Sequence, residues 1–286
     1  MGNQSFFTIY FFEKLLYNIT DLQIRGSIMK VCVIASGSKG NMTYVSAGNT
    51  NILIDAGISL LNASKRVKDI DLSTITDILI THEHSDHIGF LDTVLKKTNA
   101  NLYINKNSFK ALRVDIKDHL VGRKIAFIEG DSCYRIGDVE VCTLNLLHDT
   151  ANIFGFIIMH EGRKFGYFTD TGIFPSRYKH LLSSLDCFVI EANHNVEMLI
   201  NSDRDIRLIN RILSTSGHLS NQVCFELLRE TLSDQNKYII LGHVSEDCNS
   251  LNCLNEEIIT KIYKLNNFKG EIIVASQNEA TKIIEI

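Results

Sequence analysis

Short runs of apolar residues alternate along the chain with longer segments whose apolar residues recur every three or four positions. The short runs, bounded by polar residues, predict buried strands, whereas the longer spacing predicts helices that bury one face. Strands are expected at residues 30–35, 42–45, 51–54, 77–80, 101–104, 125–128, 139–144, 153–159, 164–168, 187–191, 237–241, 271–275 and 281–286. Helices are expected at residues 59–68, 88–97 and 203–211, from Ser220 onward, and at 251–263.

The alternation of strands and helices predicts an α/β protein built from two similar halves. Residues 77–82 and 237–243 echo one another, because each segment runs from an apolar strand into a histidine. Buried sheets need cover on both faces, so two such halves predict a four-layer αββα sandwich with the sheets face to face. No linker, repeat array or low-complexity stretch divides residues 29–286, which we expect to form a single domain.

The first 28 residues differ from the rest of the chain. Aromatic and aliphatic residues crowd the segment from Phe6 to Tyr17, where Glu13 and Lys14 interrupt them. This run is too short and too interrupted to cross a bilayer, and it lacks the basic leader of a signal peptide. It is either a docked amphipathic helix or an extension that precedes a native start at Met29, and we prefer the second interpretation.

The composition places few further limits on function. A chain of 286 residues with 45% hydrophobic and 22% charged residues is typical of a globular protein with a sizeable core. The net charge of −4 gives no general attraction to nucleic acid, so any basic contact surface must be local. Seven cysteines without a Cys-x-x-Cys pair favour small buried side chains in a reduced, cytoplasmic protein over a disulfide framework.

The strongest chemical signal follows the apolar strand that begins at Asp77. An extended backbone turns His82 and His84 to one side, and Asp86 and His87 follow where the chain must bend. Imidazole nitrogens and carboxylate oxygens suit Zn²⁺, Mn²⁺ or iron. Two metals about 3.5–4 Å apart are the usual arrangement for clamping a phosphoryl or carbonyl group. A histidine-rich surface loop is the alternative interpretation.

Other apolar strands also end in residues that bind metals or hold their ligands. These residues are Asp55, His148, Asp170, Glu191 and His243. We expect Asp55 to hold a ligand or a loop by hydrogen bonds, although a plain turn aspartate is the alternative. His148 and Asp170, each taken alone, are ordinary loop residues, so their shared placement after strands carries the argument.

Two segments are candidate anion sites. The amides of the tight loop at 36–41, which contains Ser38 and Asn41, can form a nest for an anion, but turn chemistry explains the loop equally well. Ser220 is a credible N-cap of the helix that follows it, and the free amides at a helix start attract anions. His218 beside this helix start can add a hydrogen bond or a proton.

Three arginines form a possible phosphate-contact stripe. Arg204, Arg207 and Arg211 are spaced to share one face of the helix expected at 203–211. A stripe of this kind can contact phosphates, although a solvated face is the commoner outcome. Asp203 and Asp205 dilute its positive charge, so it supports a nucleic-acid substrate only weakly.

The pattern His82-x-His84-x-Asp86-His87 after a buried strand resembles the signature of the metallo-β-lactamase superfamily. The resemblance implies the αββα metallo-β-lactamase fold and two divalent metal ions, Zn²⁺ or Mn²⁺. The implied ligands are His82, His84 and His148 for one metal and Asp86, His87 and His243 for the other, with Asp170 bridging both. Zinc β-lactamases of the three-His/Asp-Cys-His type have cysteine at the position of Asp170, whereas a carboxylate is similar to phosphodiesterases and some thioesterases.

Later motifs narrow the resemblance to one branch. The segments at 217–221 and 241–245 are similar to motifs of tRNase Z and related phosphodiesterases. Together with the loop at 36–41 and Glu191-Ala192-Asn193-His194, they look most like the WalJ (YycJ)-like exonuclease branch over roughly residues 29–286. That branch usually has an aspartate after its Asn-His pair, whereas this chain has Asn195. The substrate contacts implied by these motifs are Ser38, Asn41, His218, Ser220 and Asn221, and Glu191 is implied to hold a ligand.

These features together predict a metal-dependent phosphodiesterase, and specifically a DNA exonuclease that uses a hydroxide activated by two metals. Asp86 and His218 are the expected catalytic residues, with His218 donating a proton or contacting the phosphate. A hydrolase for small esters, thioesters or cyclic nucleotides is the main alternative. A non-catalytic, metal-binding regulatory protein is less favoured because the ligand set is complete. The expected partner is DNA, without a membrane, and the expected location is the cytoplasm.

Overall fold

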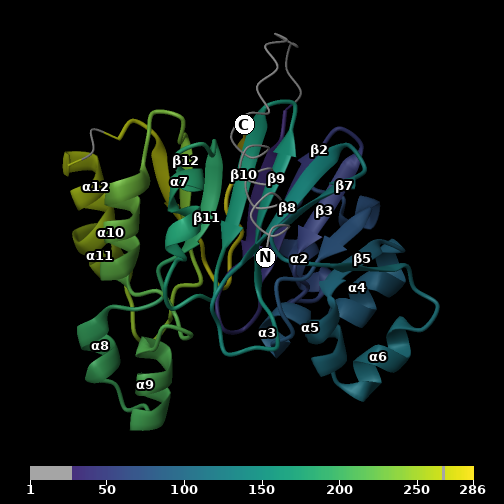
Figure 1. Cartoon of the computed structure of the whole chain (residues 1–286), viewed down its shortest axis with the longest axis horizontal. Helices are drawn as coiled ribbons and strands as arrows, with labels where there is room; N and C mark the ends of the chain where they lie inside the picture. Colours follow the sequence, from purple (N-terminus) through teal and green to yellow (C-terminus); the bar gives the residue numbers. More distant parts are fainter. Residues whose placement is uncertain (1–27, 266–267) are drawn as a thin grey trace, which may run out of the picture.

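Two seven-stranded sheets form the centre of the computed structural model, which describes residues 28–265 and 268–286 (Figure 1). The first sheet has the order β14-β1-β2-β3-β4-β5-β6, and the second has the order β13-β12-β11-β10-β9-β8-β7. The first sheet contains β1 (Lys30–Ala35), β2 (Met42–Ala47), β3 (Thr50–Ile54), β4 (Asp77–Leu79), β5 (Asn101–Asn105), β6 (Ile125–Ile128) and β14 (Ile284–Glu285). The second contains β7 (Ser132–Ile136), β8 (Val139–Asn145), β9 (Phe154–His160), β10 (Arg163–Phe168), β11 (Cys187–Glu191), β12 (Tyr238–Gly242) and β13 (Glu271–Val274).

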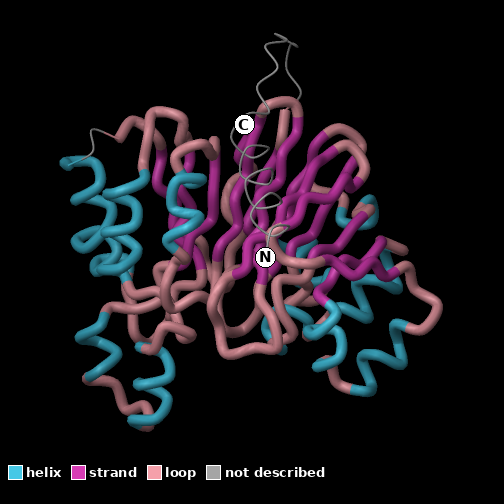
Figure 2. The backbone as a smooth tube through the Cα atoms, in the orientation of Figure 1, coloured by secondary structure: helices cyan, strands magenta, loops and turns pink. Residues whose placement is uncertain are grey.

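Helices flank the strands on both sides of the molecule (Figure 2). The helices before β8 are α2 (Leu60–Arg66), α3 (Ser85–Ile88), α4 (Leu91–Thr98), α5 (Lys106–Ala111) and α6 (Val114–Leu120). The later helices are α7 (Lys179–Leu182), α8 (Val196–Ile200), α9 (Ile206–Leu213), α10 (Asn221–Thr231), α11 (Leu251–Leu254) and α12 (Thr260–Leu265). A π-helical segment (Asn255–Ile259) joins α11 to α12, and short 3₁₀ turns lie at Leu72–Thr74 and Ser176–Tyr178.

The alternation of side chains along the strands builds the core between the sheets. Val31 and Val33 of β1 belong to a buried cluster that includes Phe156 of the second sheet. Their neighbours Cys32 and Ile34 point to the opposite face and belong to a different cluster. Both faces of the first sheet are therefore buried, which explains why its strands read as continuous apolar runs.

A separate apolar cluster fills the space between each sheet and its helices. Val94 of α4 shares a cluster with Ile78 of the first sheet. On the other side, Leu228 of α10 shares a cluster with Ile239 of the second sheet. Helix, sheet, sheet and helix therefore follow one another through the molecule, and the predicted four-layer αββα sandwich is confirmed.

The directions of the strands decide where their polar ends meet. Strands β3 to β6 run parallel in the first sheet, and β10 to β13 run parallel in the second. Strand β8 has the direction of β10, because both are antiparallel to β9. The two segments that echo one another in the sequence become β4 and β12, each between two parallel neighbours. Side chains after the carboxyl ends of such strands can share one edge, where α/β proteins bind ligands.

Some elements differ from those expected from the sequence. Strand β7 and helices α5, α6, α7 and α8 were not expected. The helix predicted at 88–97 corresponds to α4, and the short α3 before it was not expected. Cys133 and Cys142 face each other across β7 and β8 and form a disulfide. This bond contradicts the expectation that the cysteines are all free thiols, while the other five are free.

The N-terminal segment discussed above lies outside the described residues, apart from Ile28. The described sheet begins at Met29, whose amide donates to the Ile286 carbonyl at 3.0 Å and whose carbonyl accepts from the Ile286 amide at 3.0 Å. Within the part of the chain that the structure describes, no helix is both long enough and apolar enough to cross a bilayer.

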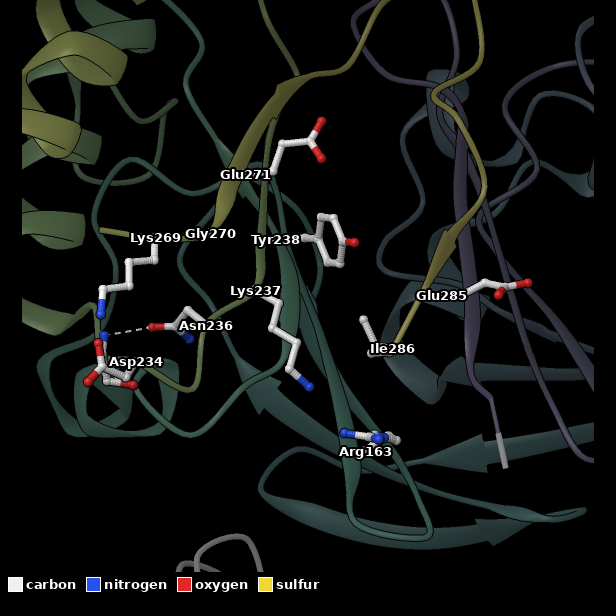
Figure 3. A pocket seen from close by; sticks show the side chains of 11 residues that line it. Arg163, Asp234, Asn236, Lys237, Tyr238, Lys269, Gly270, Glu271, Glu285 and Ile286 are labelled. Atoms are coloured by element: carbon white, nitrogen blue, oxygen red, sulfur yellow. Dashed lines mark hydrogen bonds between the residues drawn. The ribbon is translucent and has the colours of Figure 1, made fainter. Parts of the chain in front are cut away.

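A groove of about 770 Å³ lies at the amino ends of β10, β12 and β13 (Figure 3). Arg163 and Lys237 in its lining pair with the buried Asp186 at 3.7 and 2.9 Å. Its other charges include the carboxylates of Glu271 and Glu285. The imidazole and carboxylate groups singled out in the sequence lie at the opposite ends of these strands.

Candidate metal centre

The histidine-rich loop after β4 rests on backbone from two other segments. The Ala56 amide donates to the His87 carbonyl at 2.7 Å, and the Asn41 amide donates to the Asp86 carbonyl at 2.8 Å. Gly57 approaches this loop so closely that a Cβ there would stand 1.7 Å from the Asp86 carbonyl oxygen. Glycine is therefore required at this position, and the contact fixes the loop against the sheet.

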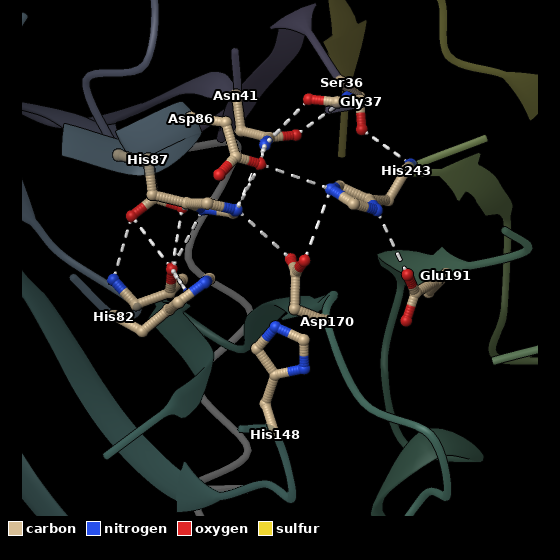
Figure 4. A network of polar contacts seen from close by, with 12 residues as sticks. Ser36, Gly37, Asn41, His82, Asp86, His87, His148, Asp170, Glu191 and His243 are labelled. Atoms are coloured by element: carbon tan, nitrogen blue, oxygen red, sulfur yellow. Dashed lines mark hydrogen bonds and ion pairs between the residues drawn. The ribbon is translucent and has the colours of Figure 1, made fainter. Parts of the chain in front are cut away.

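Seven candidate ligands from separate segments come together at one edge of the sheets, and Figure 4 labels all of them except His84. Six of them form two groups, and in each group the ligand atoms lie within 4.8 Å of one another. The first group is His82, His84 and His148, and the second is Asp86, His87 and His243. The structure thus brings the two sets of candidate ligands together as separate triads.

Asp170, the seventh side chain, lies between the two groups. Its Oδ2 is 3.4 Å from His87 Nε2, and its Oδ1 is 3.3 Å from His243 Nε2. The same carboxylate lies within 4.8 Å of a ring nitrogen of His82 from the first group. Asp170 is therefore placed where one carboxylate can reach metals in both groups.

The two histidines that follow β4 are each oriented by a bond to Nδ1. His87 Nδ1 contacts Asp55 Oδ2 at 2.7 Å, and His82 Nδ1 contacts Thr81 Oγ1 at 3.0 Å. Asp55 also accepts bonds from the Thr81 amide and hydroxyl at 2.9–3.0 Å. Partners of this kind fix the tautomer and the ring of a metal-binding histidine, leaving Nε2 for the metal.

The histidines from the second sheet are oriented in the same way. His148 Nδ1 lies 3.1 Å from the carbonyls of both Ser216 and Gly217. His243 Nδ1 lies 3.1 Å from Glu191 Oε1. Four of the candidate ligands therefore direct Nε2 to the centre of the site.

Buried polar atoms that make no hydrogen bond show whether these residues fit a metal. The Nε2 atoms of His82, His148 and His243 and the Oδ2 atom of Asp170 are buried without a hydrogen-bond partner. Each such atom costs about 1–3 kcal/mol if nothing binds it. Four of them meeting at one place fit divalent metal ions, for which imidazole and carboxylate are preferred ligands.

Burial and nearby charges shift the pKa values of the imidazoles in two opposite directions. Burial lowers the pKa of both His82 and His148, which keeps them neutral, as a metal requires. Burial also opposes charge on His87 and His243, but the Asp170 carboxylate and its acidic neighbours outweigh burial and raise their pKa well above 6.5. A metal that binds His87 and His243 must therefore displace protons.

His218 resembles His243 in its bonds but not in its exposure. Glu191 Oε1 accepts from Nδ1 of His218 at 2.7 Å, and the two rings stack with centroids 5.2 Å apart. The side chain of His218 is 18% exposed, whereas that of His243 is 3% exposed. His218 therefore lies at the mouth of the site, where its Nε2 can meet a substrate.

Glu191 is a buried carboxylate with four partners. Its Oε1 accepts from His218 and His243, and its Oε2 accepts from the Thr171 and Leu219 amides at 3.0 and 3.2 Å. Burial raises the pKa of Glu191, but the positive charges of His218 and His243 outweigh it and hold that pKa at about 2. Glu191 is therefore ionised and fixes both rings.

Three residues of the site have a strained backbone. Asp55, Asp170 and His243 have φ values of 64°, 58° and 50°, in the left-handed region that non-glycine residues avoid. This conformation costs about 1–2 kcal/mol per residue. Backbone strain of this kind is concentrated at functional sites. The three strained residues follow strands at the edge of the sheets where the candidate ligands lie.

The expected substrate contacts have different surroundings. Asn41 is buried, and its Nδ2 lies 3.1 Å from both Asp86 Oδ2 and His87 Nε2. Ser220 caps α10 by accepting from the Val223 amide. Asn41 thus supports the candidate ligands, while the hydroxyl of Ser220 is occupied by the helix.

In the described structure, the other two expected substrate contacts, Asn221 and Ser38, form no bond to the candidate ligands. Asn221 is buried and donates to Asn249 and Glu257 at 3.0 and 2.8 Å, which makes it part of the helix packing. Ser38 is exposed at the surface, and no bond places it against the candidate ligands among the residues described. His218 is the one expected substrate contact that stands open at the mouth.

The arginine stripe does not form a single free face. Arg204 precedes α9 and pairs with Asp247 at 3.1 Å. Arg207 pairs with Asp205, two residues before it, at 3.0 Å. Arg211 pairs instead with Asp149, the residue that follows His148.

Three supporting residues were not expected from the sequence as part of the site. Thr81 bridges Asp55 to His82, Ser36 accepts from the His243 amide at 2.8 Å, and Asn193 donates to the His243 carbonyl at 2.8 Å. Each of the three follows an apolar strand and precedes or belongs to a motif already noted. A polar residue directly after an apolar strand was the pattern that identified the candidate ligands. Thr81, Ser36 and Asn193 fit the same pattern.

Comparison with known proteins agrees with this arrangement. The β-lactamase superfamily domain matches residues 50–243. The chain is 34% identical to "Exodeoxyribonuclease YycJ" of Bacillus anthracis over 76% of this chain and 83% of that protein. It is 30% identical to "Exodeoxyribonuclease WalJ" of Streptococcus pneumoniae over 90% of this chain and 98% of that protein.

Solved structures with little sequence identity share the fold. The metallo-β-lactamase fold protein YhfI of Bacillus subtilis superposes with a TM-score of 0.68 at 16% identity, covering 91% of this chain and 100% of that chain. A diphosphatase of the PhnP family gives a TM-score of 0.64 at 14% identity, covering 91% and 98%. The short form of human tRNase Z gives 0.60 at 16% identity, covering 89% and 99%. These similarities establish the metallo-β-lactamase fold.

Proposed function

This chain belongs to the β-lactamase superfamily, and from that premise we propose that it is a metal-dependent phosphodiesterase that acts as a DNA exonuclease. The observation that carries the proposal is the Asp170 carboxylate, which lies between two groups of imidazole and carboxylate donors. A bridging carboxylate between two metals suits displacement at phosphorus, where both the attacking and the leaving oxygens need stabilisation.

The proposed cofactor is a pair of divalent ions, Zn²⁺ or Mn²⁺. His82, His84 and His148 would hold one ion, Asp86, His87 and His243 would hold the other, and Asp170 would contact both. When bound, the ions supply a hydroxide at neutral pH and polarise the phosphoryl group. Asp86 would hold the second ion and orient it toward the phosphate, which is the catalytic role we assign to it.

The chain's own residues position the reaction and handle a proton. Glu191 holds His218 by Nδ1, so His218 Nε2 is the atom that meets the leaving oxygen. Protonated at Nε2, His218 donates to that oxygen or to a phosphate oxygen. Asn41 holds Asp86 by its amide and keeps that carboxylate turned to the site. Asp55 does the same for His87.

DNA is the favoured substrate because the relatives at 30–34% identity carry the name exodeoxyribonuclease. A small-molecule hydrolase for esters, thioesters or cyclic nucleotides is the second candidate, because the PhnP-family diphosphatase has the same fold. The exposed position of His218 beside the buried triads favours a catalytic protein over a regulatory metal-binding one. We also propose that residues 29–286 form one domain that carries this activity in the cytoplasm.

A panel of substrates tests this assignment. Purified protein supplied with Mn²⁺ or Zn²⁺ is assayed against single- and double-stranded DNA, RNA, a glutathione thioester and a penicillin. We expect release of nucleotides from the ends of DNA at rates far above lactam or thioester hydrolysis. Faster turnover of the thioester or the penicillin would assign the protein to the second candidate class.

A further inference from the structure

Two exposed cations stand at opposite ends of the candidate metal centre. In Figure 4, His148 and the segment from Gly37 to Asn41 lie on opposite sides of Asp170. Arg211 reaches the His148 end, and Lys39 belongs to the loop at the other end. Arg211 and Lys39 lie far apart in the sequence, and the fold brings them to the two ends of the candidate metal centre.

Arg211 is connected to the first triad through one carboxylate. Its Nε donates to Asp149 Oδ2, while Asp149 Oδ1 lies 3.4 Å from His148 Nε2. The segment that follows α9 also contacts this histidine, because His148 Nδ1 lies 3.1 Å from the Gly217 carbonyl. Arg211 therefore lies one carboxylate away from the place where a metal would bind His148.

Lys39 belongs to the loop whose Asn41 contacts Asp86 and His87 of the second triad. Its Nζ pairs with Glu246, which follows His243 by three residues. Glu246 is also held by Asn278, and the Lys39 amide donates to Gln277 at 2.7 Å, so the loop is anchored on both sides. The Lys39 side chain is 71% exposed, and that of Arg211 is 51% exposed.

Both ion pairs are exposed enough to open for a substrate. Pairs at a protein surface contribute little to stability, because water screens them. A phosphate presents the same anionic oxygens as a carboxylate, and arginine binds either group through its planar guanidinium. A phosphate near either cation can therefore take the place of the carboxylate of Asp149 or Glu246.

We propose that Arg211 and Lys39 bind the phosphates on either side of the scissile bond, so that the enzyme acts on polynucleotides rather than on small phosphodiesters. This inference rests on the proposed function and adds the two residues that favour a polynucleotide at the same site. On this proposal, a small diester has no neighbouring phosphates for the two cations to bind, so they affect only a substrate that carries such phosphates.

The test compares two substrates across matched variants. Arg211→Gln and Lys39→Gln are assayed on single-stranded DNA and on bis(p-nitrophenyl) phosphate, at several salt concentrations. Arg207→Gln is the control, because Arg207 lies on the same helix but, among the residues described, pairs only with Asp205, two residues before it. Metal content and the thermal midpoint of each variant confirm that the fold and the metal site are intact.

We expect each variant of Arg211 or Lys39 to raise KM for DNA about threefold to fivefold, and the double variant to raise it about tenfold or more. The dependence of DNA affinity on salt should weaken by about 0.7 for each lost contact. Hydrolysis of the small diester, and the Arg207→Gln protein, should stay unchanged.

DNA hydrolysis by the unaltered protein with no change in either variant would overturn this inference and leave the proposed function standing. An equal rise in KM for Arg207→Gln would also overturn it, because net charge would then explain the effect. If the unaltered protein hydrolyses the small diester but no DNA, the proposed function fails and this inference fails with it.

Discussion

His218 and His243 share their sequence neighbours and their Nδ1 partner, yet the structure gives them different surroundings. Both follow a glycine and both contact Glu191 through Nδ1. His243 follows β12 and is buried with Nε2 3.3 Å from Asp170 Oδ1, whereas His218 precedes the N-cap of α10 at the mouth of the site. The two histidines therefore have different expected roles. His243 Nε2 faces the candidate metal site, whereas His218 Nε2 is available to a substrate.

Replacing each histidine with alanine should separate these roles. We expect His243→Ala to lose metal and activity together, because its Nε2 is one of the buried unpaired atoms. His218→Ala should keep its metal and lose kcat by roughly 10²–10⁴-fold. Elemental analysis and rates with good and poor leaving groups measure the two effects. A His218→Ala protein that lost metal, beside a His243→Ala protein that kept it, would reverse the assignment.

Asn195 is the position at which the chain departs from the exonuclease branch that it resembles, and its contacts supply a physical reason. Its Oδ1 caps α8 by accepting from the Met198 amide at 2.8 Å, and its Nδ2 donates to Glu257 Oε1. Asn221 donates to the other oxygen of the same carboxylate at 2.8 Å. An aspartate would keep the cap but would face Glu257 with a second negative charge.

The Asn195→Asp variant should therefore be less stable by about 1–3 kcal/mol, measured as the free energy of unfolding in urea. The loss combines a missing donor with repulsion between two carboxylates. Adding Glu257→Gln should restore most of the stability, because the glutamine amide can donate to the introduced carboxylate. Unchanged stability in the single variant would show that the bond to Glu257 contributes nothing.

At the scale of elements, the strongly apolar strands and the long amphipathic helices could be predicted from the sequence. Strand β7 could not, because its residues are partly exposed and their pattern is mixed, as suits the edge of a sheet. Helices α5 and α6 are short and bury few side chains, so they lack the apolar spacing that identifies a helix. Gly89 and Phe90 divide α3 from α4 because the backbone there docks on Ala56.

The N-terminus of α10 explains the position of Ser220. Ser220 was expected both to cap this helix and to contact substrate, and the structure confirms the cap. Ser220→Ala should reduce the free energy of unfolding by about 1 kcal/mol and leave KM for DNA unchanged. Ser250→Ala, at the N-cap of α11, is the matched control and should show a similar loss. A rise in KM confined to Ser220→Ala would restore the substrate contact.

At the scale of the whole molecule, the clustering of the candidate ligands could be predicted because they follow apolar strands, and the two sheets bring those ends together. The pairing of Arg204 and Arg211 could not, because it depends on Asp247 and Asp149 from distant segments. The support of His243 by Ser36 likewise depends on contact between the two sheets. Periodicity identifies which residues end a strand, but only the packed sheets decide which ends meet.

The opposed pKa shifts predict how the stability of metal-free protein depends on pH. Burial lowers the pKa of His82 and His148, so the unfolded chain binds more protons below about pH 6.5, and stability rises as the pH rises to that value. For His87 and His243, burial is outweighed by the Asp170 carboxylate and the pKa is raised. The folded chain then binds more protons above about pH 6.5, so stability falls as the pH rises through the raised values.

Urea unfolding of chelator-treated protein should therefore give a maximum near about pH 6.5. Protein loaded with metal should lack the decline at higher pH, because metal replaces the protons on His87 and His243. A steady rise in the stability of the metal-free protein from about pH 6 to about pH 9 would mean that the carboxylates do not hold these protons.

The central claim is that two metal ions bridged by Asp170 perform the hydrolysis, and a titration of metal against activity tests it most directly. Stripped protein receives Mn²⁺ or Zn²⁺ in steps, and bound metal and DNA hydrolysis are measured on the same samples, for the unaltered chain and for Asp170→Ala. We predict that activity appears as occupancy approaches two ions per chain, and that Asp170→Ala loses at least one ion and nearly all activity. Full activity with one ion or none, or full occupancy in the Asp170→Ala protein, would contradict the claim.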